Sequence, residues 1–227
     1  MPRRRYYRRR RYTRRRKTNV PWYRKKYSAL ELASKAVSGV RYLKGLVNSE
    51  LLKRDKNGQA LGIDRDGLVI PFTDISQGDN DGNRTGNSIF VRRVQFNFQA
   101  LCKVNDLQSL RVIIFKDGQQ AGDTLPTPSM LLDAVGTRYA VQSGLNNETV
   151  GRFTILANRV IQFSPYRPAV TYRLGVPMRH HVRYNGSQIT DIQKGGLYVL
   201  LITNADPTVT NDQIDVNYWM RISYHDN

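Results

Sequence analysis

Hydrophobic and polar residues alternate with a period of two through much of the chain after residue 68. In the stretch VQFNFQALCK, one side of the alternation consists of Val94, Phe96, Phe98, Ala100 and Cys102. The segment 214–224 repeats the pattern, with Ile214, Val216, Tyr218, Met220, Ile222 and Tyr224 on one side. Alternation of this kind predicts strands that bury one face. Cys102 lies on the buried face, which favours a packed thiol over a nucleophile.

Further strands are predicted at 110–116, 152–163, 169–184 and 196–204, with a hairpin or a bulge near Asn158. The segments RVIIF and YVLLI are apolar on both faces, as expected for central strands that are covered from two sides. One short helix, PSMLLDA, is predicted from Pro128. About eight strands with few helices indicate an all-β sandwich or barrel, and periodicity alone does not distinguish the two.

Residues 28–53 have a helical pattern instead. Ser28 and Glu31 match the S-x-x-E capping box, and apolar residues recur at helical spacing up to Val47. Asn57-Gly58 is the predicted stop signal. The chain therefore divides into an arm at 1–27, an amphipathic linking helix within 28–56 and a β domain at 57–227.

Charge is distributed very unevenly along these three parts. The chain has 36 Lys and Arg residues and 18 Asp and Glu residues, for a net charge of +18. Residues 1–56 hold 20 basic and 3 acidic side chains, whereas residues 57–227 hold 16 and 15. An arm with this self-repulsion and so few aliphatic residues is expected to be disordered until a polyanion neutralises it.

The arm combines cations with aromatic residues, which suits sequence-independent binding of single-stranded nucleic acid through phosphate contacts and base stacking. The predicted binding residues are Arg3, Arg4, Arg5, Tyr6, Tyr7, Arg8, Arg9, Arg10, Arg11, Tyr12, Arg14, Arg15, Arg16, Lys17, Trp22, Tyr23, Arg24, Lys25 and Lys26. The clusters at 14–17 and 24–26 could also act as a nuclear import signal for the host import machinery. Membrane insertion is not expected, because no apolar stretch is long enough to span a bilayer.

The β domain offers few candidates for chemistry. The loop QGDNDGNRTGNS lacks the glycine and the glutamate of a calcium loop and is predicted to be a polar turn. His180 and His181 point to opposite faces of a strand, so they cannot share a metal. A possible secondary basic face consists of Arg173, Arg179, His181 and Arg183; a solvated strand face is the alternative. With no catalytic constellation, metal site or cofactor motif assigned, an enzyme is not expected.

The Arg-rich arm, the helix near LVNSE, the stretch RTGNSIFVRRVQF and the segments LRVIIFKDGQQAGDTLPTPSMLLD and RFTILANRVIQF resemble the capsid proteins of small circular single-stranded DNA viruses. The chain is particularly similar to the circovirus-like branch whose shell proteins resemble that of satellite tobacco necrosis virus. The resemblance implies a single eight-stranded jelly roll, with two facing four-stranded antiparallel sheets, over residues 57–227.

The resemblance further implies a T=1 icosahedral shell of 60 copies, with the arm directed inward to package a single-stranded genome, DNA in preference to RNA. The expected location is the virion, and the host nucleus during infection. The alternative function is a nucleic-acid-binding β-barrel or chaperone with a basic tail that forms no capsid. Self-assembly into a closed particle distinguishes the two.

Overall fold

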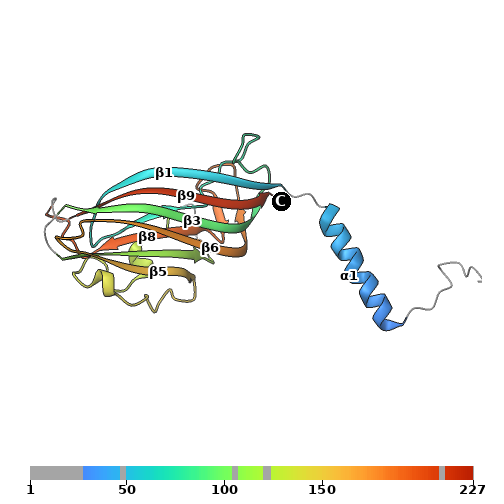
Figure 1. Cartoon of the computed structure of the whole chain (residues 1–227), viewed down its shortest axis with the longest axis horizontal. Coiled ribbons are helices and arrows are strands. Elements are labelled where there is room, and N and C mark those ends of the chain that lie inside the picture. The colour runs from blue at the N-terminus through green and yellow to red at the C-terminus, as the bar shows by residue number, and fades with distance from the viewer. Residues whose placement is uncertain (1–27, 47–49, 104–106, 120–123, 210–212, 227) are drawn as a thin grey trace, which may run out of the picture. The chain divides into compact units, whose positions relative to one another are not determined.

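The computed structural model describes residues 28–46, 50–103, 107–119, 124–209 and 213–226 (Figure 1). The chain divides into two units, Met1–Asn48 and Ser49–Asn227. In the first, helix α1 spans Ala29–Leu46. The Glu31 amide donates to Ser28 Oγ at 3.3 Å and the Ser28 amide donates to Glu31 Oε2 at 3.0 Å, which confirms the predicted capping box. Among the described residues, no helix is both long enough and apolar enough to cross a membrane.

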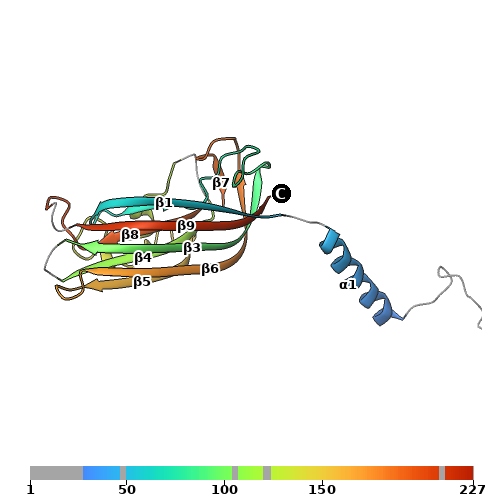
Figure 2. The same ribbon diagram turned by 45° about the horizontal axis from the view of Figure 1, so that its top comes forward.

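The second unit consists of two antiparallel sheets. One has five strands in the order β1-β9-β3-β6-β7, and the other has four in the order β2-β8-β4-β5. Figure 2 shows β1, β9, β3 and β6 running side by side. The strands are β1 Leu51–Ile63, β2 Leu68–Pro71, β3 Ser88–Cys102, β4 Gln108–Asp117, β5 Phe153–Phe163, β6 Ala169–Tyr184, β7 Ile192–Lys194, β8 Leu197–Thr203 and β9 Ile214–Asp226.

The order of the strands defines the fold. Among the described strands, the chain changes sheet at every step except from β4 to β5 and from β6 to β7, and without the short β7 the strands form two facing four-stranded sheets. This arrangement is that of a jelly roll, so the predicted all-β class is confirmed. The three-residue strand β7 pairs with the end of β6 and widens one sheet beyond the predicted four strands.

Most of the hydrophobic core lies between the two sheets. The predicted inward residues of β3 are at most 8% exposed, and β9 buries every second residue as expected apart from the half-buried Tyr218. A second cluster lies on the other side of the four-stranded sheet. There, Ile113, Phe115 and Leu200 pack against residues of the β4–β5 connection, which contains α2 Pro128–Leu131 and the short helix η2 Ala140–Gln142. Strands β4 and β8 are therefore covered on both faces, as their sequences predict.

The predicted end of the first helix is wrong. The sequence analysis placed the helix over residues 28–53 and ended the linking segment at 56. Helix α1 ends at Leu46, and residues 51–56 already belong to β1, which pairs with β9. The alternation in β1 is hard to recognise because its inward positions include Arg54 and Lys56, both half-buried. Lys56 is tolerated there because its Nζ donates to Asp74 at 2.6 Å. Polar side chains on the inner face hide the strand from a hydrophobicity pattern.

Asn57-Gly58, the predicted helix stop, lies in the middle of β1. Gly58 pairs with Tyr218 of β9, and a Cβ atom at this glycine would lie 2.5 Å from the Tyr218 hydroxyl. The glycine therefore provides space for the tyrosine ring and ends no element. Residues 152–163 form one strand, β5, and no hairpin. Its register with β4 passes over Leu156, a bulge close to the predicted position.

The loop between β2 and β3 is fixed by a buried arginine. Arg84 has no exposed surface, and its guanidinium donates to the carbonyls of Ile75 at 3.1 Å, Gly86 at 2.8 Å and Gly186. Its Cζ lies 4.0 Å from the centre of the Tyr184 ring. Burial lowers the pKa of Arg84. The polar turn predicted from the sequence is thus an anchored loop, because one cation satisfies three backbone carbonyls at once.

We expect Arg84→Met to lower the free energy of unfolding by about 2–4 kcal/mol, since buried carbonyls lose their donor while the side-chain volume is roughly kept. Equilibrium urea unfolding followed by circular dichroism measures the change. The exposed Arg167→Met is the matched control and should change stability by less than about 0.5 kcal/mol. An Arg84→Met protein as stable as this control would show that the clamp is dispensable.

Candidate nucleic-acid interface

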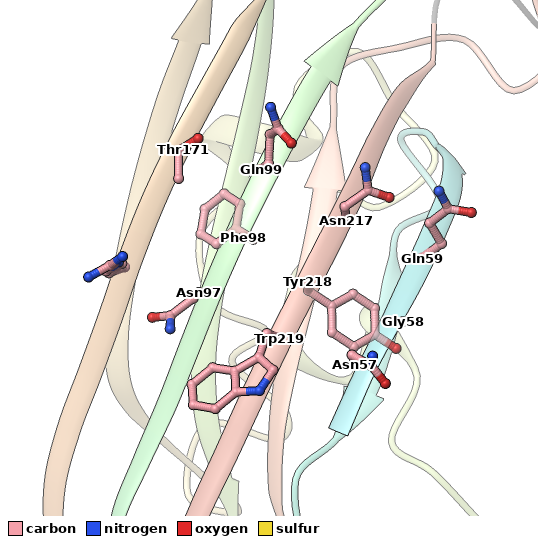
Figure 3. A pocket seen from close by; sticks show the side chains of 11 residues that line it. Asn57, Gly58, Gln59, Asn97, Phe98, Gln99, Thr171, Asn217, Tyr218 and Trp219 are labelled. Atoms are coloured by element: carbon pink, nitrogen blue, oxygen red, sulfur yellow. The ribbon is translucent and has the colours of Figure 1, made fainter. Parts of the chain in front are cut away.

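The face of the five-stranded sheet that points away from the core is strongly polar. Strand register aligns its side chains in rows that cross β6, β3, β9 and β1. One row consists of Thr171, Gln99, Asn217 and Gln59, and the next of Arg173, Asn97, Trp219 and Asn57. These two rows line an open groove of about 630 Å³. Figure 3 shows the labelled side chains of both rows lying across the three strands β3, β9 and β1 and, through Thr171, β6.

Trp219 is the aromatic centre of this groove. The guanidinium of Arg221, two residues along β9, has its Cζ 4.8 Å from the centre of the indole. Arg221 in turn donates to both carboxylate oxygens of Asp55 on β1, each at 2.6 Å. The hydrogen bonds from Arg221 lower the pKa of Asp55. A fork-to-fork pair of this kind fixes the guanidinium plane, and with it the cation beside Trp219.

Cations continue along the same face. The predicted secondary basic face is on β6, where Arg173, Arg179, His181 and Arg183 are all exposed. Arg173 lies in the groove, whereas Arg179 lines a separate hollow of about 440 Å³ with Arg92. The structure therefore brings Arg173 together with the tryptophan and the amides, and places the other three of these residues further along the strand.

A bulge in β3 adds two arginines that the sequence analysis did not assign to this face. The register of β3 shifts between Val91 and Arg93, and both Arg92 and Arg93 are exposed as a result. Arg93 lies opposite Pro177 and close to the backbone of Gly175, so it is next to β6. The consecutive arginines in FVRRVQF are the signal that could have revealed the bulge, because two adjacent charged residues cannot both point outward from a regular strand.

An aromatic row lies further along these strands. Phe90 of β3 is opposite both His181 and His225, with ring centres 4.6 Å and 6.5 Å apart. Arg92 lies 5.6 Å from the Phe90 ring. His180 points to the other face, where it is half-buried and its Nε2 donates to the Gly195 carbonyl at 3.0 Å. Burial lowers the pKa of His180. The two histidines thus have the opposite environments that the alternation predicts.

The main predicted binding residues, those between Arg3 and Lys26, lie outside the described residues. Within the described ranges, no group of three or more His, Cys, Asp or Glu side chains could hold a metal ion. The interface that the structure does describe is therefore the outward face of the five-stranded sheet. It combines arginines, amides and one tryptophan, which are side chains able to bind phosphates, base edges and base faces respectively.

The fold and this surface define a jelly-roll protein with a basic, amide-rich sheet face. No protein-family model matches the chain, and no curated protein matches it. Among solved structures, the chain is similar to that of the Macrobrachium rosenbergii nodavirus, with 13% identity over 79% of this chain and 55% of that chain and a TM-score of 0.29. It is also similar to a chain of deformed wing virus carrying the GFP gene, with 14% identity, 91% and 88% coverage and a TM-score of 0.28. The chain thus spans about half the length of the nodavirus chain, and the jelly-roll assignment depends on its own strand order.

The ion pair between Arg221 and Asp55, next to Trp219, predicts that the stability of the fold depends on pH. Because the folded-state pKa of Asp55 is lowered, the pair stabilises the fold above the unfolded value of about 3.9, and this contribution disappears as pH falls through the folded value. We expect the wild type to be slightly more stable than Asp55→Asn at pH 6 and this advantage to shrink as pH falls below about 3.9, in urea unfolding at a series of pH values.

Asp133→Asn provides the control, because Asp133 is exposed and makes no ion pair among the described residues. The difference in free energy of unfolding between Asp133→Asn and the wild type should not show the same decrease at acid pH. A difference for Asp55→Asn that stays constant from pH 6 to pH 3 would contradict the assignment.

Proposed function

We propose that the chain is the structural capsid protein of a small single-stranded DNA virus. In this proposal, 60 copies form a T=1 icosahedral shell, and the Arg-rich arm at 1–27 packages the genome. The observation that supports it most is the combination of the jelly-roll strand order with an arm that precedes β1 in the chain. Jelly rolls serve viral shells, lectins and cupins alike, so the arm is what favours a shell around nucleic acid.

Charge supplies the packaging mechanism. Residues 1–44 contain 17 basic side chains and one acidic side chain, Glu31. Sixty copies of residues 1–44 would bring roughly a thousand positive charges inside a shell, enough to neutralise a genome of one to two kilobases by phosphate contacts. The clusters at 14–17 and 24–26 would also serve import into the host nucleus before assembly. Symmetry would let many weak contacts between subunits act together in the closed shell.

A second candidate is a nucleic-acid-binding module that forms no shell. The observation that favours it is the outward sheet face, where Trp219 and several arginines are exposed or half-exposed together. The two candidates differ in assembly. Size-exclusion chromatography of nuclease-treated protein, followed at protein and nucleic-acid wavelengths with electron micrographs of the leading peak, separates them. Uniform particles that protect nucleic acid support the capsid. A 26.1 kDa monomer that binds oligonucleotides supports the module.

Deleting residues 1–27 should abolish packaging and leave the jelly roll folded, because the strands that the structure describes all lie within residues 51–226. The measurements are the nucleic acid recovered after nuclease treatment and the thermal melting transition. Replacing the arm's Arg and Lys residues by Gln at constant length is the matched control for charge, and should abolish packaging equally. A melting transition that disappears along with binding would contradict the separation of the two parts.

A further inference from the structure

Five amide side chains line the groove: Asn57 and Asn97 lie opposite Trp219 on the neighbouring strands, and Gln59, Asn217 and Gln99 form the adjoining row. Within the described part of the chain, none of them has a side-chain hydrogen-bond partner. Each amide offers both a donor and an acceptor, the combination needed to bind the polar edge of a heterocyclic base. The groove is therefore a surface with unused hydrogen-bonding capacity beside the indole of Trp219, and Phe98 and Tyr218 also contribute to its lining.

The guanidinium of Arg221 lies over one face of the Trp219 ring, so a base would stack on the opposite face. The indole is half-buried, and the cation beside it is fixed by the bidentate pair between Arg221 and Asp55. A side chain whose orientation is already restricted loses little entropy when a ligand stacks on it. Stacking of a base on an aromatic side chain contributes about 1–3 kcal/mol.

Charge and size indicate the kind of ligand. Arg173 is opposite Asn97, which is opposite Trp219, so two strand spacings of about 4.8 Å place the arginine backbone about 10 Å from that of the tryptophan. A phosphate next to a stacked base lies within reach of a long arginine side chain. The hollow of about 630 Å³ is open to solvent along the sheet face, so a strand that contacts it with one or two bases can continue past it on either side.

We propose that this groove binds one or two unpaired bases of a single strand. A base stacks on Trp219, the amides bind its edge, and Arg173 contacts the adjoining phosphate. The proposal rests on the proposed function, since it takes nucleic acid as the partner, and it adds to the charge-dependent arm a contact that requires bases. Duplex is disfavoured because its bases are already stacked and paired. Amides around a tryptophan also suit a neutral sugar, but the arginines of this face favour a polyanion.

The test uses the fluorescence of Trp219 itself. The full chain has two tryptophans, so Trp22→Phe leaves Trp219 as the single reporter. The protein is titrated with a 12-nucleotide oligothymidylate, with the ribo-oligouridylate of the same length, and with an abasic oligomer of the same length and charge. We expect saturable quenching by both base-containing strands and little by the abasic one. The half-saturation concentrations for the base-containing strands should be about 5- to 150-fold lower than that of the abasic oligomer. Comparison of the two quenching strands shows whether the groove prefers DNA or RNA.

Two variants made in the Trp22→Phe background test whether the quenching of Trp219 arises from binding in the groove. Asn97→Ala with Gln99→Ala should raise the half-saturation concentration for oligothymidylate and leave abasic binding, measured by gel shift, unchanged. Gln162→Ala, an exposed amide on β5, is the matched control and should change neither.

Each of the following outcomes would contradict the groove proposal, and each also shows whether the proposed capsid function still stands. If all three oligomers shift the protein in a gel while Trp219 emission stays constant, the groove proposal fails and arm-based packaging stands. If no oligomer binds, both fail. If the neutral sugar chitotriose quenches Trp219 and oligothymidylate does not, the groove is a saccharide site.

Discussion

The packing of one sheet against the other constrains everything else in the jelly roll. Burial of the inward side chains of β3 and β9 against the four-stranded sheet fixes which way each residue points, since a shift of one residue would expose the core. The same register then fixes the positions of the outward residues across β6, β3, β9 and β1. Arg173, Asn97, Trp219 and Asn57 form a row because their inward neighbours are buried, not because they attract one another.

Local pattern was sufficient for the strands that bury apolar residues. β3 and β9 alternate as their sequences indicate, and β4 and β8 are apolar on both faces because the β4–β5 connection covers the second one. β1 was missed because its inward positions hold Arg54 and Lys56, and the charge of Lys56 is compensated by Asp74, which lies outside the strand and 18 residues further along the chain. A hydrophobicity pattern contains no information about such a partner. The sequence therefore predicts the class of fold correctly but not the position of the first strand, β1.

The residues that form the surface groove were harder to predict from the sequence than the fold, for a related reason. The polar side of β9, with Asn217, Trp219 and Arg221, can be read directly from the alternation. Its neighbours cannot, because strand order in a jelly roll joins segments that are more than 100 residues apart, such as Asn57 and Trp219. The bulge at Arg92 is a further long-range feature, since it depends on the register with both β6 and β9. The basic residues of β6 were predicted together as one face of a strand, but the amide and aromatic residues that lie next to them on β3, β9 and β1 were not.

Under the proposed function, the arm and the sheet would contribute different kinds of affinity. Phosphate contacts by a cationic arm release counterions, so this contribution falls steeply with salt and does not depend on which bases are present. Stacking on Trp219 and hydrogen bonds to the amides depend little on ionic strength and require unpaired bases. The arm alone would neutralise any polyanion of sufficient length. A groove that accepts only exposed bases would select single strands from duplex, a distinction that charge by itself cannot make, and would retain that selection at salt concentrations where the arm binds weakly.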